Sequence, residues 1–137
     1  MPLKQFTLSR GERLKSRKQI DMLFRQGNHL NVFPLRVSYV LSKANPADEP
    51  LQFGIGVSGK YFKRAVDRNR IKRLSRESWR LQKNDLKNIL LDKQLNMVLF
   101  VVYTGRDMPE YEMISQSMSK VIEKLYGIAN ETAEANT

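Results

Sequence analysis

The sequence predicts an α+β fold in which a small sheet carries helices. Two segments rich in strand-forming residues, at 35–42 and 51–58, and a continuous apolar run at 97–103 indicate the sheet, while helical periodicity in other segments indicates the helices. The chain has 137 residues, of which 41% are hydrophobic, and this is the size and composition of one globular domain. We therefore expect one domain over residues 1–127, beginning with an N-terminal arm over about 1–14.

The first half of the chain is expected to form one helix and a hairpin. Ile20, Leu23 and Phe24 have helical spacing within 16–26, and Gly27 is placed to end that helix. The two strand-like segments that follow are joined by a polar loop with two prolines, so we expect them to pair as an antiparallel hairpin.

The second half is expected to contain a basic helix, a strand and a further helix. The basic segment at 63–80 has a helical period, and an irregular continuation is expected through 86–95. The run at 97–103 is apolar at every position, which is typical of a central strand buried on both faces. An apolar stripe then indicates a helix over 111–127, and the small polar residues of 128–137 indicate a disordered tail.

Composition and charge exclude several classes of function. There are no cysteines, so disulfides, thiolate metal sites and thiol nucleophiles are excluded. The N-terminus has no apolar segment typical of a signal peptide, and the run at 97–103 is too short to cross a bilayer. A formal net charge of +10 and a pI near 10.0 predict a polyanionic partner. We therefore expect a cytoplasmic protein with no small-molecule substrate.

The basic segment at 63–80 is the strongest functional signal. It carries eight basic residues, six of them arginines, against two acidic ones, and arginine is favoured where bidentate contacts to phosphate matter. A solvated face, a disordered arm and a membrane-surface helix are the alternatives. The period argues against the arm, serines opposite the charges argue against the membrane, and repulsion between like charges favours a bound polyanion over a solvated face. One side of this helix is expected to hold Ile71, Leu74, Ser75 and Ser78, and the opposite side Asn69, Lys72, Arg73, Arg76 and Arg80.

Two other features have enzymatic alternatives. The segment 54–61, GIGVSGKY, fits a phosphate-binding loop up to Tyr61, which replaces the hydroxyl residue that would coordinate magnesium. A more ordinary interpretation is that Gly54 and Gly56 lie on one face of a strand and allow a close approach. His29, the only histidine, is expected in a turn without catalytic or metal-binding partners, so we interpret it as a surface or turn residue.

Aromatic side chains on the expected helix and strands are candidates for stacking on unpaired bases. Phe24 and Phe53 are at least as well explained as core residues, whereas Tyr39 is a better candidate because its hydroxyl needs water or a partner. On charge and periodicity alone, a general RNA-binding or ribosome-associated protein stays an alternative, and a phosphate-loop nucleotide-binding protein is a remote one.

The residues RAVDRNRIKRLSRE resemble the signature of the bacterial ribonuclease P protein component, with its central Arg-Asn-Arg at 68–70 and Ile-Lys-Arg at 71–73. The context is similar as well. RLKSRKQIDMLFRQG resembles the first helix of that family, FGIGVSGK the strand before the basic helix, and MVLFVVYTG the last strand. The resemblance covers roughly residues 8–127.

This resemblance implies a small four-stranded sheet packed with about three helices, and a left-handed βαβ crossover, which is an exception to the usual handedness. It also implies a protein subunit that binds the catalytic RNA of ribonuclease P and the 5′ leader of precursor tRNA. Such a subunit assists endonucleolytic maturation of the 5′ end, while the RNA and Mg²⁺ perform the chemistry. No catalytic or metal-binding side chain is expected in this chain.

The resemblance also assigns residues to each contact. The leader is expected in a cleft lined by Phe24 of the first helix and Tyr39 of the first strand. Ile20 stands where many members have a phenylalanine, and Gly59 stands where a lysine is common. Contact with the catalytic RNA is expected at Lys60, Lys63, Arg64, Arg68, Asn69, Arg70, Lys72, Arg73 and Arg76.

Overall fold

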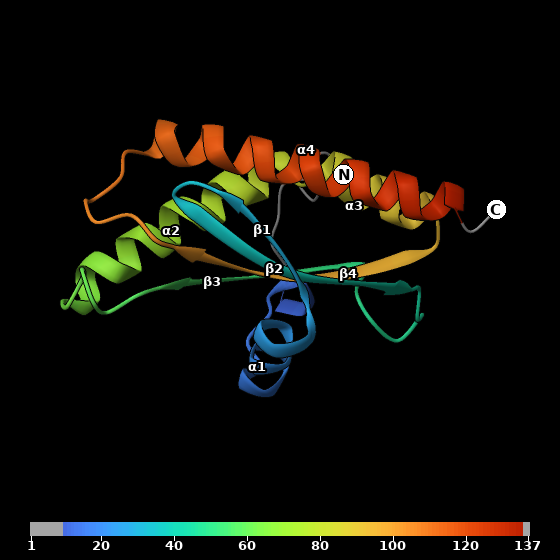
Figure 1. Cartoon of the computed structure of the whole chain (residues 1–137), viewed down its shortest axis with the longest axis horizontal. Helices are drawn as coiled ribbons and strands as arrows, with labels where there is room; N and C mark the ends of the chain where they lie inside the picture. Colours follow the sequence, from blue (N-terminus) through green and yellow to red (C-terminus); the bar gives the residue numbers. More distant parts are fainter. Residues whose placement is uncertain (1–9, 136–137) are drawn as a thin grey trace.

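A four-stranded sheet separates two unequal layers of the protein (Figure 1). The computed structural model describes residues 10–135, in which α2, α3 and α4 cover one face of the sheet, here the helical face, and α1 lies on the other, here the α1 face. The elements are η2 (Arg10–Glu12), α1 (Arg17–Gln26), β1 (Asn28–Val32), β2 (Leu35–Lys43), β3 (Leu51–Val57), α2 (Ala65–Gln82), α3 (Asn84–Asp92), β4 (Leu95–Tyr103) and α4 (Tyr111–Ala135). The predicted α+β fold with a four-stranded sheet is confirmed.

The strands lie in the order β1-β2-β4-β3, with β3 parallel to β4 and the other pairs antiparallel. The prediction that residues 35–42 and 51–58 pair as a hairpin is therefore wrong, because β4 lies between them. The most apolar strand, β4, is an inner strand of the sheet, and both of its edges are paired. The loop that was expected to close a hairpin instead spans the start of β4, where Ala44 N donates to Gln94 O and Met97 N donates to Pro50 O.

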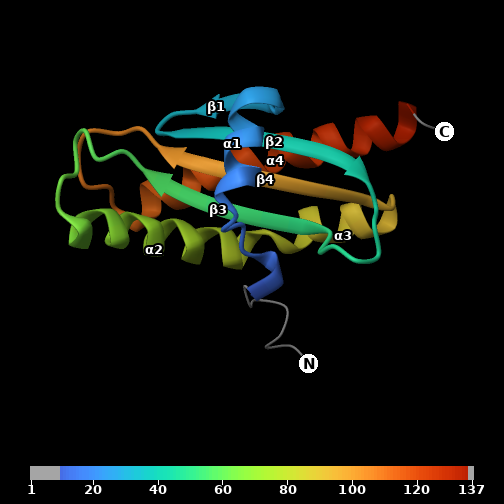
Figure 2. The ribbon, with the colours of Figure 1, turned by 90° about the horizontal axis from the view of Figure 1, so that it is seen from below.

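The connection from β3 to β4 runs through α2 and α3 on the helical face. Seen from the α1 face in Figure 2, β3 lies below β4, both arrows point left, and α2 runs along the lower edge of the sheet, with the helical face turned away from the viewer. This arrangement is a left-handed crossover, as the resemblance implied.

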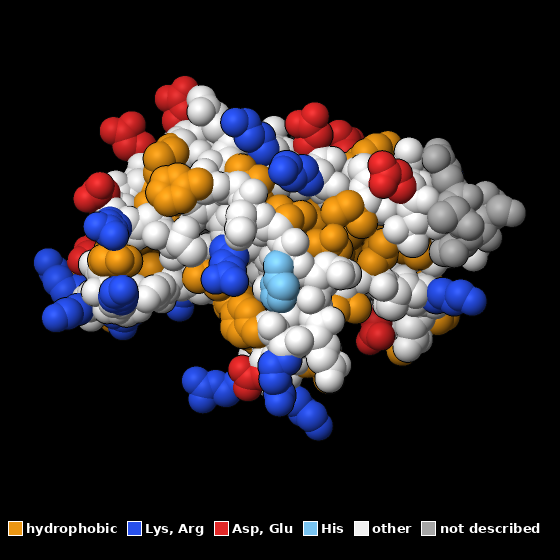
Figure 3. Space-filling view, viewed as in Figure 1, with side chains coloured by type: hydrophobic (Ala, Val, Ile, Leu, Met, Phe, Trp, Pro, Cys, Tyr) orange, Lys and Arg blue, Asp and Glu red, His pale blue; other side chains and the backbone are white. Residues whose placement is uncertain are grey.

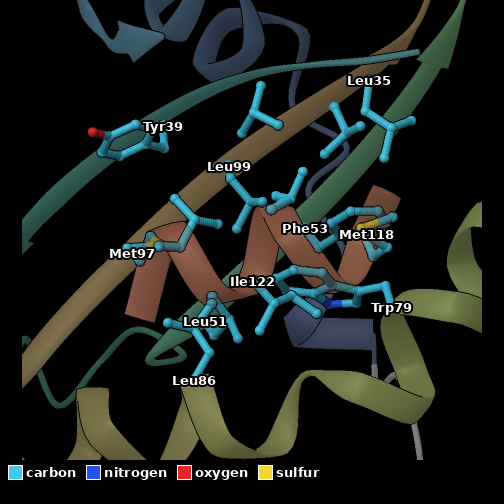
Figure 4. Packing of buried hydrophobic residues seen from close by; sticks show 14 of the residues in the cluster. Leu35, Tyr39, Leu51, Phe53, Trp79, Leu86, Met97, Leu99, Met118 and Ile122 are labelled. Atoms are coloured by element: carbon cyan, nitrogen blue, oxygen red, sulfur yellow. The ribbon is translucent and has the colours of Figure 1, made fainter. Parts of the chain in front are cut away.

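The core lies between the sheet and its three helices. Phe53 of β3 and Trp79 of α2 stack with ring centroids 4.5 Å apart and an interplanar angle of 11°, and both side chains are almost fully buried (Figure 4). Truncating a buried aromatic side chain of this kind typically costs about 3–5 kcal/mol. The stack thus fixes α2 beside β3 and leaves the opposite side of the helix to solvent.

The helix predicted over 16–26 is confirmed as α1. The Ser16 side chain caps it by accepting a hydrogen bond from Gln19 N at 3.4 Å, and Gly27 N donates to Leu23 O at the other end. Any side chain at Gly27 would place its Cβ 2.5 Å from that carbonyl oxygen, so glycine is required at this turn.

The turn expected around His29 is wrong, because residues 28–32 form β1. Only Leu30 and Val32 in this strand pack against the core, which leaves too short an alternation to indicate a strand from sequence. On the other face of β1, the ring of His29 is exposed, and its Nδ1 lies 2.8 Å from the hydroxyl of Ser38 on β2.

The irregular helix expected after the basic segment is a separate element, α3. Lys83 both ends α2 and precedes α3, so residues 10–135 contain four α-helices where about three helices were expected. The side chain of Lys83 is buried and pairs with the buried carboxylate of Glu12. A local interruption of this kind depends on a partner 71 residues away, which helical periodicity does not contain.

The disordered tail expected over 128–137 is wrong for residues 128–135, because α4 continues to Ala135. Gly127 does not have a positive φ and lies within the helix. Ala129 is fully buried and Ile128 packs against the core, so contact with the rest of the protein extends the helix beyond the glycine.

Part of the expected N-terminal arm is joined to the free edge of β3. Leu14 N donates to Phe53 O at 2.8 Å, and the side-chain amide of Gln52 donates to Gly11 O at 3.0 Å. The remainder of that arm, residues 1–9, lies outside the described residues.

Candidate nucleic-acid interface

Arg68, the first residue of the Arg-Asn-Arg motif, holds the start of α2 in place. Its Nη1 donates to the carbonyl oxygens of Phe62 and Lys63, both at 2.7 Å, and its side chain is half-buried. The last residues of the loop before α2 are thus tied to the first turns of the helix. Arg68 therefore has a structural role that the sequence did not reveal, in addition to any contact that its remaining donors make.

The rest of the motif faces solvent. Asn69, Arg70, Arg73 and Arg76 are exposed, Lys72 is half-buried, and none of these side chains has an ion pair or hydrogen bond within residues 10–135. The predicted helical period is confirmed, although Trp79 rather than the half-buried Leu74 completes the buried side. That side consists of Ile71, Ser75, Ser78 and Trp79.

The uncompensated basic surface of α2 ends about one turn beyond Arg76. Arg80 forms an ion pair with Glu77 at 2.6 Å, and the hydrogen bond from Arg80 lowers the pKa of Glu77. Because Glu77 is exposed and Arg80 is only half-buried, this pair contributes little to stability, but it neutralises the charge of Arg80 locally.

Further basic residues gather where α2 begins. Lys60, Lys63 and Arg64 are all exposed, and the backbone N–H groups at a helix N-terminus add partial positive charge to theirs. Arg106, from the loop between β4 and α4, joins them: its guanidinium lies 5.3 Å from the centre of the Tyr61 ring, and the ammonium of Lys60 lies 5.4 Å from it. Arg106 was missed because only the fold brings these two loops together.

The phosphate-loop alternative does not fit the structure. Gly54 and Gly56 lie inside β3 rather than in a loop, and a Cβ at either position would fall within 3.0 Å of the ring of Phe100. The two glycines thus form a shallow track on the α1 face that this ring occupies. The interpretation that they permit a close approach is confirmed, with an aromatic ring of the neighbouring strand as the group that approaches.

An aromatic pair lies between α1 and the sheet. Phe24 of α1 is 44% exposed and contacts Phe100 edge to face, with ring centroids 5.5 Å apart at an interplanar angle of 87°. The strand registers show which other side chains share this face of the sheet. They include His29 and Asn31 of β1, Arg36, Ser38 and Val40 of β2, and Val98 and Val102 of β4.

Tyr39 does not lie on the α1 face, so its predicted position in one cleft with Phe24 is wrong. It alternates with Ser38 and therefore points to the helical face, where it packs with Leu99 in the core and is only 8% exposed (Figure 4). Burial raises the pKa of its hydroxyl. Phe24 and Tyr39 consequently lie on opposite faces of one sheet and cannot hold the same strand of RNA.

Phe100 and Arg36 are the residues of the α1 face that sequence reasoning missed. For Arg36, the alternation of apolar and polar residues along β2 was the signal that could have found it. Within 35–41, Leu, Val, Tyr and Leu occupy the odd positions and Arg, Ser and Val the even ones, which assigns Tyr39 to the apolar face and Arg36 to the other. The run at 97–103 has no such alternation, so Phe100 could be placed only once the partners of β4 were known.

Basic side chains are not spread evenly over the molecule. In Figure 3, Lys and Arg side chains crowd α1 and the end of the molecule where α2 begins, whereas most Asp and Glu side chains in that view lie over α4. No helix within residues 10–135 is long and apolar enough to span a membrane. The same residues contain no group of three or more His, Asp or Glu side chains that could hold a metal ion.

Comparison with known proteins shows a near full-length match. The sequence model of the Ribonuclease P family matches residues 8–126. The ribonuclease P protein component of Porphyromonas gingivalis is 34% identical over 131 residues, which are 96% of this chain and 95% of that protein. The chain belongs to the ribonuclease P protein family. The ribonuclease P protein component of Chlorobaculum tepidum is 40% identical over 87 residues, which are 61% of this chain and 55% of that protein.

The fold agrees with this membership. The ribonuclease P protein of Staphylococcus aureus superposes with a TM-score of 0.62, covering 82% of this chain and 93% of that one at 22% sequence identity. The protein is therefore a subunit of ribonuclease P, the ribonucleoprotein endonuclease that matures the 5′ end of tRNA, and membership implies association with the RNA of that enzyme. This decides against a general RNA-binding protein and a phosphate-loop enzyme.

Proposed function

We propose that the exposed side of α2 and the loop before it bind the catalytic RNA, and that the α1 face holds the 5′ leader of precursor tRNA. The observation that carries this proposal is the separation of two basic surfaces by β3. One is the row on α2 with the cluster at its N-terminus, whose side chains have no acidic partner among the described residues from Lys60 to Arg76. The other is the α1 face with its aromatic pair.

The first surface suits a folded RNA. Asn69, Arg70 and Arg73 project from a rigid helix, and arginine fits phosphate oxygens through two parallel hydrogen bonds. Lys60, Lys63 and Arg64 extend the surface along the loop. Because phosphates of a folded RNA have fixed positions, a helix that is anchored by its buried side is a better binding element than a mobile arm.

The second surface suits a single strand. Phe24 and Phe100 offer ring edges and faces on which unpaired bases can stack without sequence preference, and Arg36 of β2 lies on the same face of the sheet as Phe100. Stacking of this kind is worth about 1–3 kcal/mol per base. Ile20 of α1, half-buried, supplies no ring, so Phe24 is the aromatic contribution of this helix.

We further propose that Mg²⁺ acts through the RNA. Cleavage of a phosphodiester requires the attacking and leaving oxygens to be stabilised, and magnesium bound by RNA phosphates provides this chemistry when present. The basic side chains of this protein would contribute by neutralising phosphates, which lowers the repulsion between the catalytic RNA and the precursor tRNA. We also propose that the protein acts in the cytoplasm, where precursor tRNA is processed.

The proposal is tested by cleavage at low Mg²⁺. The protein is added to the catalytic RNA of the same organism and precursor tRNA, and appearance of the mature 5′ end is followed over time. We expect stimulation by the wild-type protein and reduced stimulation by Arg73→Ala. RNA binding without stimulation would contradict the proposal.

A pair of variants separates binding from folding. Arg73→Ala removes an exposed side chain and should change the free energy of unfolding by less than about 0.5 kcal/mol. Arg68→Ala also removes two charge-assisted bonds to backbone carbonyls, and should cost about 1–3 kcal/mol. If both variants lose RNA affinity while only Arg68→Ala loses stability, the motif has both a binding role and a structural one.

A further inference from the structure

A small pocket lies between the two proposed RNA surfaces, at the free edge of β3. Its volume is about 150 Å³, and one wall is the β3 backbone around Gly54. Arg13 and Lys15 from the segment before α1 and Arg76 from α2 complete it. The pocket thus joins residues that are far apart in sequence.

Arg76 is directed here by the way α2 is packed. At 100° per residue, Arg76 and Lys72 lie on the flank of the helix that also carries Trp79, and Trp79 stacks on Phe53 of β3. Arg70 lies on the opposite flank. Exposed Asn69 shares the flank of Arg76, but of these residues Arg76 is the one that lines the pocket at the edge of β3.

The segment that carries Arg13 is fixed by buried contacts. Arg13 forms a parallel bridge with Phe53, and the next residue donates its backbone N–H to the same strand. On its other side, the carboxylate of Glu12 is buried and pairs with the ammonium of Lys83 at the junction of α2 and α3, while Lys87 lies 3.5 Å from it. Figure 2 shows this segment passing beside β3 toward that junction. The backbone that carries Arg13 is therefore held rigidly beside Arg76.

Two like charges are thereby brought together without compensation. Neither Arg13 nor Arg76 has an ion pair or a side-chain hydrogen bond within residues 10–135. Burial and the neighbouring charge of Arg13 both lower the pKa of Arg76. An anion between the two guanidinium groups would remove this repulsion and would accept hydrogen bonds from both.

We propose that Arg13 and Arg76 together bind one phosphate group of the single-stranded 5′ leader of precursor tRNA. This inference rests on the proposed function of the α1 face and deepens it. It also removes Arg76 from the surface that binds the catalytic RNA. The reason is the position of the pocket: Gly54, in its wall, lies on the α1 face against the ring of Phe100, and Lys15 lies two residues before the first residue of α1, next to the cap residue Ser16. A strand that stacks on Phe100 therefore passes the mouth of the pocket.

The test uses holoenzyme reconstituted with the catalytic RNA, and compares wild-type protein with Arg13→Gln, Arg76→Gln and the double variant. Each single variant should weaken binding of precursor tRNA about threefold to tenfold, as expected for one screened charge-assisted contact. The double variant should lose less than the product of the two factors, because both side chains bind the same phosphate. The logarithm of affinity should depend on salt with a slope smaller by about 0.7.

Changes to the leader show whether the bound phosphate belongs to the leader or to another RNA. Mature tRNA, which has no leader, should bind all four proteins equally. Replacing one leader phosphate at a time with an uncharged methylphosphonate should weaken wild-type binding at one position, and this replacement should not weaken binding by the double variant further. Equal losses with mature tRNA, or weaker binding of the catalytic RNA itself, would overturn the assignment to the leader.

Lys124→Gln on the exposed side of α4 is the matched control, since it removes one positive charge far from the pocket. If Lys124→Gln weakens binding of precursor tRNA as much as Arg76→Gln does, the loss is explained by net charge alone and the proposal is overturned. If wild-type protein fails to stimulate cleavage, the proposed function itself fails. If wild-type protein stimulates cleavage and the arginine variants bind as it does, only the phosphate site fails. If one of the single variants does not fold, the methylphosphonate series is run on the other, in which replacing the contacted phosphate should weaken binding less than it does in wild-type protein.

Discussion

Gly54→Ala tests the packing of Phe100 against β3 on the face proposed to hold the leader. An added Cβ would lie 2.7 Å from Cδ2 of Phe100 and 2.9 Å from the backbone oxygen of Leu14. The ring could turn, but the backbone oxygen belongs to the segment that is hydrogen-bonded to β3. Something in the structure must therefore shift.

The magnitude follows from two opposed effects. Overpacking of this kind typically costs about 1–3 kcal/mol, and replacing glycine with alanine returns about 0.4–1 kcal/mol by restricting the unfolded chain. We expect a net loss of about 1–2 kcal/mol. At Gly56 a Cβ would meet only the far edge of the Phe100 ring, at 2.9 and 3.0 Å, so Gly56→Ala should cost less.

The assay is equilibrium unfolding in urea. With a slope of about 2 kcal/mol per molar, Gly54→Ala should lower the midpoint by about 0.5–1 M. Gly59→Ala is the matched control, because no atom lies within 4 Å of its added Cβ and no positive φ restricts it. Phe100→Leu should abolish the cost of Gly56→Ala and only part of the cost of Gly54→Ala, since the Leu14 oxygen stays. Equal midpoints for Gly54→Ala and Gly59→Ala would refute the packing described here.

Three further predictions concern stability. Gly127→Ala should raise the free energy of unfolding by about 0.5–1 kcal/mol, since this glycine lies inside α4 with no atom within 4 Å of an added Cβ; a lower urea midpoint would contradict a continuous helix. Glu12→Gln should cost about 3–5 kcal/mol by removing the carboxylate beside the buried ammonium of Lys83, and Glu12→Gln combined with Lys83→Met should regain much of it in the same assay. Burial raises the pKa of both Tyr39 and Tyr103, so their neutral forms stabilise the fold below pH about 10, the value for an unfolded tyrosine, and this stability is lost as pH rises through their higher folded pKa. An ultraviolet absorbance titration should show late ionisation that Tyr39→Phe reduces, and early ionisation of Tyr39 would place its ring in an open cleft.

The local sequence pattern was sufficient to predict the helices that bury one side at a regular 3.6-residue period. The 3.6-residue period from Ile71 to Ser78 predicted which side of α2 is exposed, and Gly27 predicted the end of α1. Pairing of strands was beyond the same reasoning. Whether β3 joins β2 or β4 depends on contacts between segments more than forty residues apart, and the loop between β2 and β3 has turn residues that suit either arrangement.

The candidate site was predictable in its chemistry and less so in its geometry. The composition of the basic helix predicted a contact with RNA, yet it did not distinguish Arg68, which anchors a loop, from Arg73, which is free to bind. That distinction depends on where the carbonyl groups of residues 62 and 63 point. Tyr39 differs: the alternation in β2 did contain its position, and the need of a phenol for a polar partner was given too much weight.

The place of β4 in the sheet has a consequence for how the chain matures during translation. β4 is the last strand to leave the ribosome, yet it is the partner of both β2 and β3. Until residues 95–103 emerge, the β1–β2 hairpin is the only part of the sheet that can pair, and the basic helix has no completed surface to pack on. Non-local pairing of this kind folds slowly. The two surfaces proposed to bind RNA would consequently become available together, after most of the polypeptide has been made.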